Sequence, residues 1–118
     1  MTRELCRADD IPDGEGRGFV LEQDEADLLA GGVRDIFVVR RGREIFGYVN
    51  SCPHTGTPLD WIEDQFMTRD KRRILCATHG AEFRIDDGRC VNGPCIGDAL
   101  RRLHVVVREN RVHLEPGK

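Results

Sequence analysis

Two short segments of the chain each place a cysteine and a histidine within one turn of each other. Cys52 and His54 are separated by one proline, Cys76 and His79 by two residues, and 21 residues lie between the pairs. Thiolate and neutral imidazole are both good ligands for transition metals. Two such pairs supply the four ligands of a zinc site or an iron–sulfur cluster. The spacing therefore favours a fold in which two ligand-bearing loops face each other.

The order of ligands within each pair distinguishes between the metals. Structural zinc sites usually keep like ligands together, as in C-x(2–4)-C and H-x(3–5)-H. Here each motif mixes one cysteine with one histidine, so facing loops can direct both cysteines to one metal and both histidines to another. A cluster with two chemically different irons fits this arrangement. A zinc-binding interaction module is a less favoured alternative.

The pattern C-P-H-x(21)-C-A-T-H-G resembles the Rieske [2Fe–2S] signature, in which two histidines replace two cysteines on one iron. The resemblance covers essentially the whole chain and includes further residues beside the motifs: Gly56, Leu59, Gly80 and Gly93-Pro94. It implies one [2Fe–2S] cluster as the cofactor. Cys52 and Cys76 would bind the inner iron, and His54 and His79 the outer, solvent-facing iron.

Two departures from the family pattern bear on the reduction potential. High-potential, quinol-oxidising members carry a disulfide between the two loops, at positions that are Thr57 and Thr78 here. They also place a serine and a tyrosine hydroxyl near the cluster, where this chain has Ala81 and Phe83. Because hydroxyl donors stabilise the reduced, more negative state, their loss lowers the potential. The resemblance therefore implies a low-potential, soluble, ferredoxin-like member.

The rest of the sequence predicts an all-β fold. Apolar runs and turn signals predict strands at 36–39, 44–49, 81–85, 103–107 and 111–114. The 36–39 run is uniformly apolar, as in a strand buried on both faces. One short helix is predicted over 24–30, with Asp24 as its N-cap and Gly31 as its stop.

The resemblance specifies the architecture further. It implies a Rieske-type antiparallel β-sandwich with a smaller cluster-binding subdomain of two ligand loops. The 118 residues support one domain, 1–118, with the subdomain at approximately 50–95.

Composition excludes several classes of function. The net charge of −3 argues against nonspecific nucleic-acid binding. No apolar run approaches the roughly 20 residues of a membrane span, and the first residues lack the apolar core of a signal peptide, so we expect a cytoplasmic protein. Without a secretory signal, five cysteines do not indicate a disulfide framework. Three of them lie outside the motifs and are expected to behave as small buried side chains: Cys6, Cys90 and Cys95.

The favoured function is one-electron transfer from a flavin-dependent reductase to an oxygenase or other redox enzyme. Such a carrier would not be an enzyme itself and would bind no organic substrate, nucleic acid or membrane. An oxygenase catalytic subunit is excluded, because only His104 and His113 remain for a second iron. The alternative is a small subunit of a larger oxidoreductase complex, of the nitrite reductase small-subunit type. Retention of all four ligand residues argues against the cluster-free version of that type.

Overall fold

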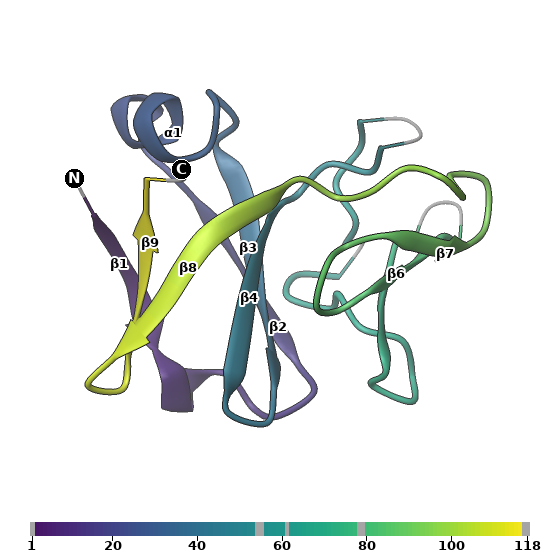
Figure 1. The fold of residues 1–118 in the computed structure, drawn as a ribbon, viewed down its shortest axis with the longest axis horizontal. Helices are drawn as coiled ribbons and strands as arrows, with labels where there is room; N and C mark the ends of the chain where they lie inside the picture. The colour runs from purple at the N-terminus through teal and green to yellow at the C-terminus, as the bar shows by residue number, and fades with distance from the viewer. Residues whose placement is uncertain (1, 54–55, 61, 78–79, 117–118) are drawn as a thin grey trace.

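The computed structural model describes residues 2–53, 56–60, 62–77 and 80–116. Within these residues a six-stranded and a three-stranded antiparallel sheet form two lobes side by side (Figure 1). The elements in chain order are β1 (Arg3–Arg7), η1 (Ala8–Asp10), β2 (Gly16–Val20), α1 (Gln23–Leu29), β3 (Asp35–Arg41), β4 (Glu44–Val49), β5 (Arg73–Leu75), β6 (Glu82–Arg84), β7 (Cys90–Asn92), β8 (Arg102–Arg108) and β9 (Arg111–Glu115).

The large lobe is a sandwich made from a single sheet that folds over itself. Its strand order is β1-β9-β8-β4-β3-β2. Val38 of β3 nevertheless packs in one buried cluster with Cys6 of β1 and Val112 of β9, which are not its neighbours in the sheet. The two halves of the sheet must therefore face each other across a shared core, as the ribbon shows (Figure 1). The predicted antiparallel β-sandwich is confirmed.

Strand β3 is buried on both faces, as its uniform apolar run predicts. Ile36 and Val38 point into the core of the sandwich. Phe37 and Val39 belong to a different cluster, which includes Phe83 of the small sheet. Successive side chains of a strand point to opposite faces, so the run covers two cores at once. The small lobe therefore packs on the outer face of the sandwich.

The small lobe consists of β5, β6 and β7 together with the segments that precede and follow them. β6 lies between β5 and β7, and Phe83 of β6 stands opposite Ile74 on one side and Cys90 on the other. All three of these residues are buried. The predicted strand 81–85 is thus confirmed, with a shorter extent of 82–84.

The two predicted hairpins of the large lobe are confirmed. β3 and β4 pair across a turn that contains Gly42, and β8 and β9 pair across Glu109 and Asn110. Both of these last residues have positive φ, 51° and 63°. That combination is typical of a two-residue hairpin turn whose twist matches the strands.

The N-cap predicted for the helix is wrong. α1 begins at Gln23, and its N-cap is Glu22 rather than Asp24. The carboxylate of Glu25 accepts the backbone N–H of Glu22 at 3.1 Å, and Arg3 donates to the same carboxylate at 2.9 Å. This tertiary ion pair holds Glu25 where its carboxylate accepts the N–H of Glu22, so the N-cap lies two residues before the predicted one. The predicted stop is confirmed, since Gly31 follows the C-cap with a φ of +62°.

Four strands lack a sequence signal and were not predicted. β1, β2, β5 and β7 are three to five residues long and show no clear alternation of apolar and polar residues. Each forms because an already defined strand offers it hydrogen bonds, as β9 does for β1. No helix in the described part of the chain is long and apolar enough to cross a lipid bilayer.

Candidate functional site

Cys52 and Cys76 each open a tight turn, and the two turns have the same backbone hydrogen bonds. The N–H of Cys52 donates to the carbonyl of Thr57 at 2.8 Å, and the N–H of Gly56 donates back to the carbonyl of Cys52 at 2.6 Å. In the second turn Cys76 donates to Ala81 at 2.8 Å and Gly80 donates to Cys76 at 2.9 Å. Two segments that are far apart in sequence thus present a cysteine in the same backbone setting.

A glycine four residues after each cysteine makes these turns possible. Gly56 and Gly80 have φ values of +76° and +70°, in the left-handed region that side chains with a Cβ disfavour. Among the described residues, a Cβ added to Gly80 would meet no atom within 4 Å. The positive φ by itself favours glycine at this position.

Hydrogen bonds join the two turns to each other. The N–H of Ala77, directly after Cys76, donates to the carbonyl of Leu59 at 2.9 Å. Leu59 in turn donates its N–H to the side-chain oxygen of Asn50 at 2.8 Å, just before the first turn. Both cysteines are buried, with exposed fractions of 1% for Cys52 and 0% for Cys76. The structure therefore places the turns that begin at Cys52 and Cys76 next to each other.

The histidines that complete the predicted ligand set lie outside the described residues. His54 and His79 fall in the segments 54–55 and 78–79, as does Thr78, one of the two threonines at which the resemblance predicts no inter-loop disulfide. The other residues that mark departures from the high-potential pattern are described. Thr57 closes the first turn, and Ala81 and Phe83 are fully buried beside the second.

Aromatic contacts attach the site to the large lobe. Phe66, which lies between the two turns in sequence, stacks on Phe37 of β3 with ring centroids 4.3 Å apart. Tyr48 of β4 donates its hydroxyl to the carbonyl of Ile85 at 2.5 Å. Burial raises the pKa of this tyrosine well above its usual value. Sequence patterns could not identify Phe66, because no strand or helix contains it.

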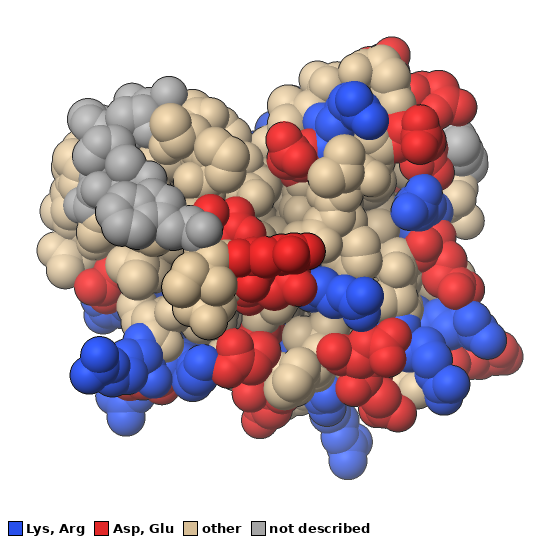
Figure 2. Space-filling model, turned by 180° about the vertical axis from the view of Figure 1, so that it is seen from behind, with Lys and Arg blue, Asp and Glu red and all other residues tan. Residues whose placement is uncertain are grey.

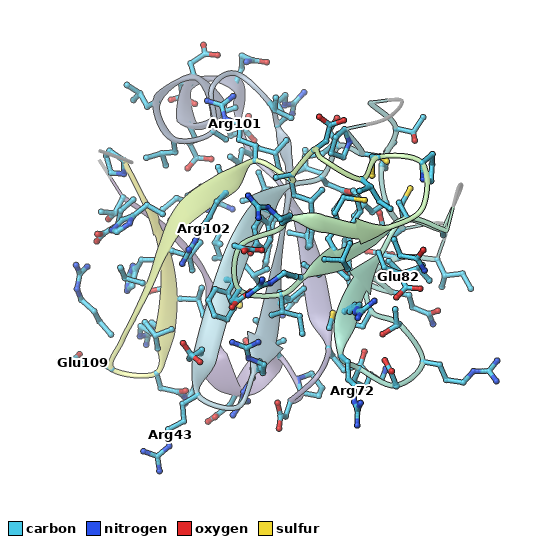
Figure 3. All side chains as sticks on the ribbon, turned by 45° about the vertical axis from the view of Figure 1, so that its right-hand side comes forward. Arg43, Arg72, Glu82, Arg101, Arg102 and Glu109 are labelled. Atoms are coloured by element: carbon cyan, nitrogen blue, oxygen red, sulfur yellow. The ribbon has the colours of Figure 1, made fainter. Side chains whose placement is uncertain are left out.

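A third loop, residues 93–98 after β7, covers the second turn. Gly93 approaches so closely that a Cβ on it would lie 2.7 Å from the Cα of Ala81. Cys90 and Cys95 flank this glycine and its proline, and both are buried. Figure 3 shows sulfur atoms gathered at one end of the small lobe. Burial, and secondarily the neighbouring sulfur of Cys90, raise the pKa of the Cys95 thiol to about 12.

A groove of about 520 Å³ runs where the two lobes meet. Four carboxylates line it: Asp35, Asp60, Glu63 and Asp64. Figure 2 shows acidic side chains gathered along this junction. Two of them have structural roles. Asp64 accepts the N–H of Gly18 in β2 at 2.7 Å, and Asp60 accepts from the side-chain amide of Asn50 at 3.1 Å.

Comparison with known proteins gives the same fold and a family. A model of the Rieske [2Fe-2S] domain matches residues 2–108. The ferredoxin of carbazole 1,9a-dioxygenase from Nocardioides aromaticivorans IC177 is 21% identical, with a TM-score of 0.75 over 99% of both chains. The terminal oxygenase of carbazole 1,9a-dioxygenase from Novosphingobium sp. KA1 is 21% identical, with a TM-score of 0.76 over 99% of this chain and 30% of that one. No curated protein sequence matches the chain.

Proposed function

Because the chain belongs to the Rieske [2Fe-2S] domain family, we propose that it is a one-electron carrier that passes electrons from a reductase to an oxygenase or another redox enzyme. The cluster, when bound, supplies a one-electron redox couple. The chain itself would not be an enzyme and would bind no organic substrate. Its proposed location is the cytoplasm.

The pair of matching turns at Cys52 and Cys76 is the observation that carries this proposal. Two buried thiols in equivalent backbone settings, joined through Ala77 and Leu59, are the donor set that one side of a small cluster requires. We assign Cys52 and Cys76 to the inner iron. His54 and His79 are assigned to the outer iron by their places in the motif. The cluster-binding subdomain is then residues 50–95 of a single domain, 1–118.

The residues around the cysteines set the polarity of the cluster's surroundings and thereby its reduction potential. Leu59, Ala81 and Phe83 are fully buried and exclude water from the inner side of the site. A dry surrounding with few hydroxyl donors disfavours the additional negative charge of the reduced state. The potential is therefore expected at the low end of the range for Rieske centres.

The proposed partners are proteins of an oxygenase system. A complex of reduced oxygenase and oxidized ferredoxin in carbazole 1,9a-dioxygenase contains a chain 23% identical to this one, with a TM-score of 0.72. Two large apolar side chains are exposed in the segments that follow the first turn and form the third loop. Ile62 is 63% exposed and Ile96 is 67% exposed. We propose that they contribute to the surface on which a redox partner docks.

The test is the metal content and spectrum of anaerobically purified protein. We expect two irons and two acid-labile sulfides per chain. After dithionite reduction we expect an EPR spectrum of mixed nitrogen and sulfur ligation. Cys52→Ser and Cys76→Ser should each abolish cluster binding. Cys6→Ser is the matched control, because Cys6 is also buried but lies in the core of the sandwich. Full iron and sulfide in Cys76→Ser would contradict the ligand assignment, and bound zinc in the wild type would contradict the function.

A further inference from the structure

Two cysteines outside the ligand motifs lie in direct contact with each other. The sulfur of Cys95 is 2.8 Å from the sulfur of Cys90, and both side chains are at least 97% buried, with exposed fractions of 2% and 3%. The thiol of Cys90 in turn donates to the carbonyl of Asn92 at 3.3 Å. Neither cysteine has a part in the proposed cluster binding. The contact sets this pair apart from Cys6, which packs among Ile11, Val38 and Val112.

Backbone hydrogen bonds close the segment that carries the two cysteines. The N–H of Cys90 donates to the carbonyl of Asp98, and the N–H of Asp98 donates to the carbonyl of Cys95, both at 2.9 Å. These bonds close the loop at its base and aim both side chains inward. A disulfide has a sulfur–sulfur length of about 2.05 Å, so the sulfurs need to approach by less than about 1 Å.

We propose that Cys90 and Cys95 are a site of reversible oxidation, at which a peroxide converts the two thiols to a disulfide. When the loop opens, one of the two thiols leaves the buried surroundings that raise its pKa, loses its proton and attacks a peroxide oxygen as the thiolate. A sulfenic acid is left on that cysteine, and the proton and the departing hydroxide form one water. The second sulfur displaces the hydroxyl group as a further water, and the S–S bond forms. In total two thiols and one hydrogen peroxide give one disulfide and two waters. The two sulfurs supply the two electrons that the peroxide accepts.

The location of the pair gives the bridge a structural consequence. Gly93, between the two cysteines, packs against the backbone of Ala81, and Ala81 closes the turn that starts at Cys76. A bond from Cys90 to Cys95 would fasten the third loop in this contact. Neighbouring residues 92, 94 and 96–99 are exposed, so small local openings of the loop admit a small oxidant. The closed bridge should therefore slow the release of metal from the site.

The experiment uses the iron-loaded protein and reads the two thiols directly. After exposure to hydrogen peroxide, free thiols are alkylated under denaturing conditions and the protein is digested with trypsin. Cleavage after Arg89 and Arg101 yields one peptide, 90–101, whose only cysteines are Cys90 and Cys95. A bridged peptide lacks two hydrogens and both alkyl groups, and dithiothreitol restores both sites of alkylation.

The expected result is a bridged peptide in the wild type and in Cys6→Ser while the visible absorption of the cluster is retained. Cys90→Ser and Cys95→Ser should yield an unbridged peptide. If both cysteines stay open to alkylation until the cluster is lost, or pair first with Cys52 or Cys76, the proposal is wrong. The wild-type measurement needs no variant, so a misfolded serine variant does not weaken the test.

A second measurement tests the structural consequence, which rests on the proposed cluster. Iron transfer to a chelator should be several-fold slower from bridged wild type than from dithiothreitol-treated wild type. In Cys90→Ser the two treatments should give equal rates. Equal rates in the wild type would refute the fastening of the loop. The peptide analysis can also be made on protein that binds no iron, so a failure of the proposed function is distinguishable from a failure of the thiol site.

Discussion

At the scale of single residues, Tyr48 shows how one polar atom ties the lobes together. Its hydroxyl reaches from β4 of the sandwich to the carbonyl of Ile85 beside the small sheet, and both residues are buried. Tyr48→Phe leaves that carbonyl without its partner and should lower the free energy of unfolding by about 1–3 kcal/mol. Urea unfolding of the iron-loaded protein measures the loss. An unchanged free energy would mean that water replaces the hydroxyl.

The raised pKa of Tyr48 gives the same residue a pH signature. In the unfolded chain the phenol ionises near its usual pKa of about 10, whereas burial keeps it neutral to higher pH in the folded protein. The stabilisation is thus complete below pH 10 and is lost as the pH rises through the folded-state value. Tyr48→Phe should remove this part of the alkaline loss of stability. Tyr48 is the only tyrosine of the chain, so phenolate absorbance reports on it alone.

Ala81 and Phe83 are expected to set the potential of the site through the hydroxyls that they lack. Ala81→Ser and Phe83→Tyr should each raise the reduction potential, because a hydroxyl donor favours the more negative reduced state. Potentiometric titration followed by EPR measures the shift. Ala30→Ser is a matched control, since Ala30 is equally buried but packs with the helix in the large lobe. A potential that stays the same or falls would contradict the hydroxyl argument.

At the scale of elements, the two cysteine turns act as a repeated unit built from a cysteine and a glycine four residues later. Gly80→Ala places a side chain at a φ of +70°, without a clash with any described residue, and should cost about 1–2 kcal/mol of stability. It should also reduce the iron retained per chain, because the strain falls on the turn that begins at Cys76.

Gly42→Ala provides the matched control for this prediction. Gly42 has a φ of +63° and equally open surroundings, but lies in the β3–β4 turn, next to Arg43 at the end of the large lobe opposite α1 (Figure 3). A similar loss of stability with full iron content is expected. Equal iron loss in both variants would show that global instability, rather than the turn, governs metal retention.

At the scale of the whole molecule, burial rather than charge holds the lobes together. Phe66 is fully buried and stacks on Phe37, so Phe66→Ala should cost about 3–5 kcal/mol. Lys71 and Glu15 also link the lobes as an ion pair, but both side chains are partly exposed. Lys71→Ala should therefore cost no more than about 1 kcal/mol. Urea unfolding of both variants measures the two losses in the free energy of unfolding. A larger loss in Lys71→Ala than in Phe66→Ala would contradict the statement that burial dominates.

The proposed docking surface is also a property of the whole molecule. Ile96→Asp places a charge on an exposed apolar residue of the third loop and should slow electron delivery to a partner several-fold. Leu28→Asp is the control, because Leu28 is similarly exposed, at 63% against 67%, but lies on α1 of the large lobe. Cytochrome c reduction driven by a flavin-dependent ferredoxin reductase measures the rate. Equal rates in the two variants would place the docking surface elsewhere.

The sequence alone determined the features that depend on neighbouring residues. Alternation and turn chemistry act over a few positions, so the 36–49 and 103–114 hairpins and the stop at Gly31 could be predicted. The paired Cys-His motifs could indicate the family because the cysteine and the histidine of each motif are only two or three positions apart. The assignment of Cys52, His54, Cys76 and His79 as ligands stays a prediction from that motif.

The tertiary structure decided whatever depends on contacts between distant segments. β1 is a strand because β9, about a hundred residues later, pairs with it, and Glu22 caps the helix because Arg3 fixes Glu25. Phe66 contributes to the contact between the lobes because the fold places its ring against that of Phe37. Cys90 and Cys95 are close in sequence, but the bonds through Asp98 turn them toward each other. Such contacts arise only as the chain packs into its tertiary structure, because the free energy of burial is gained in three dimensions rather than along the chain.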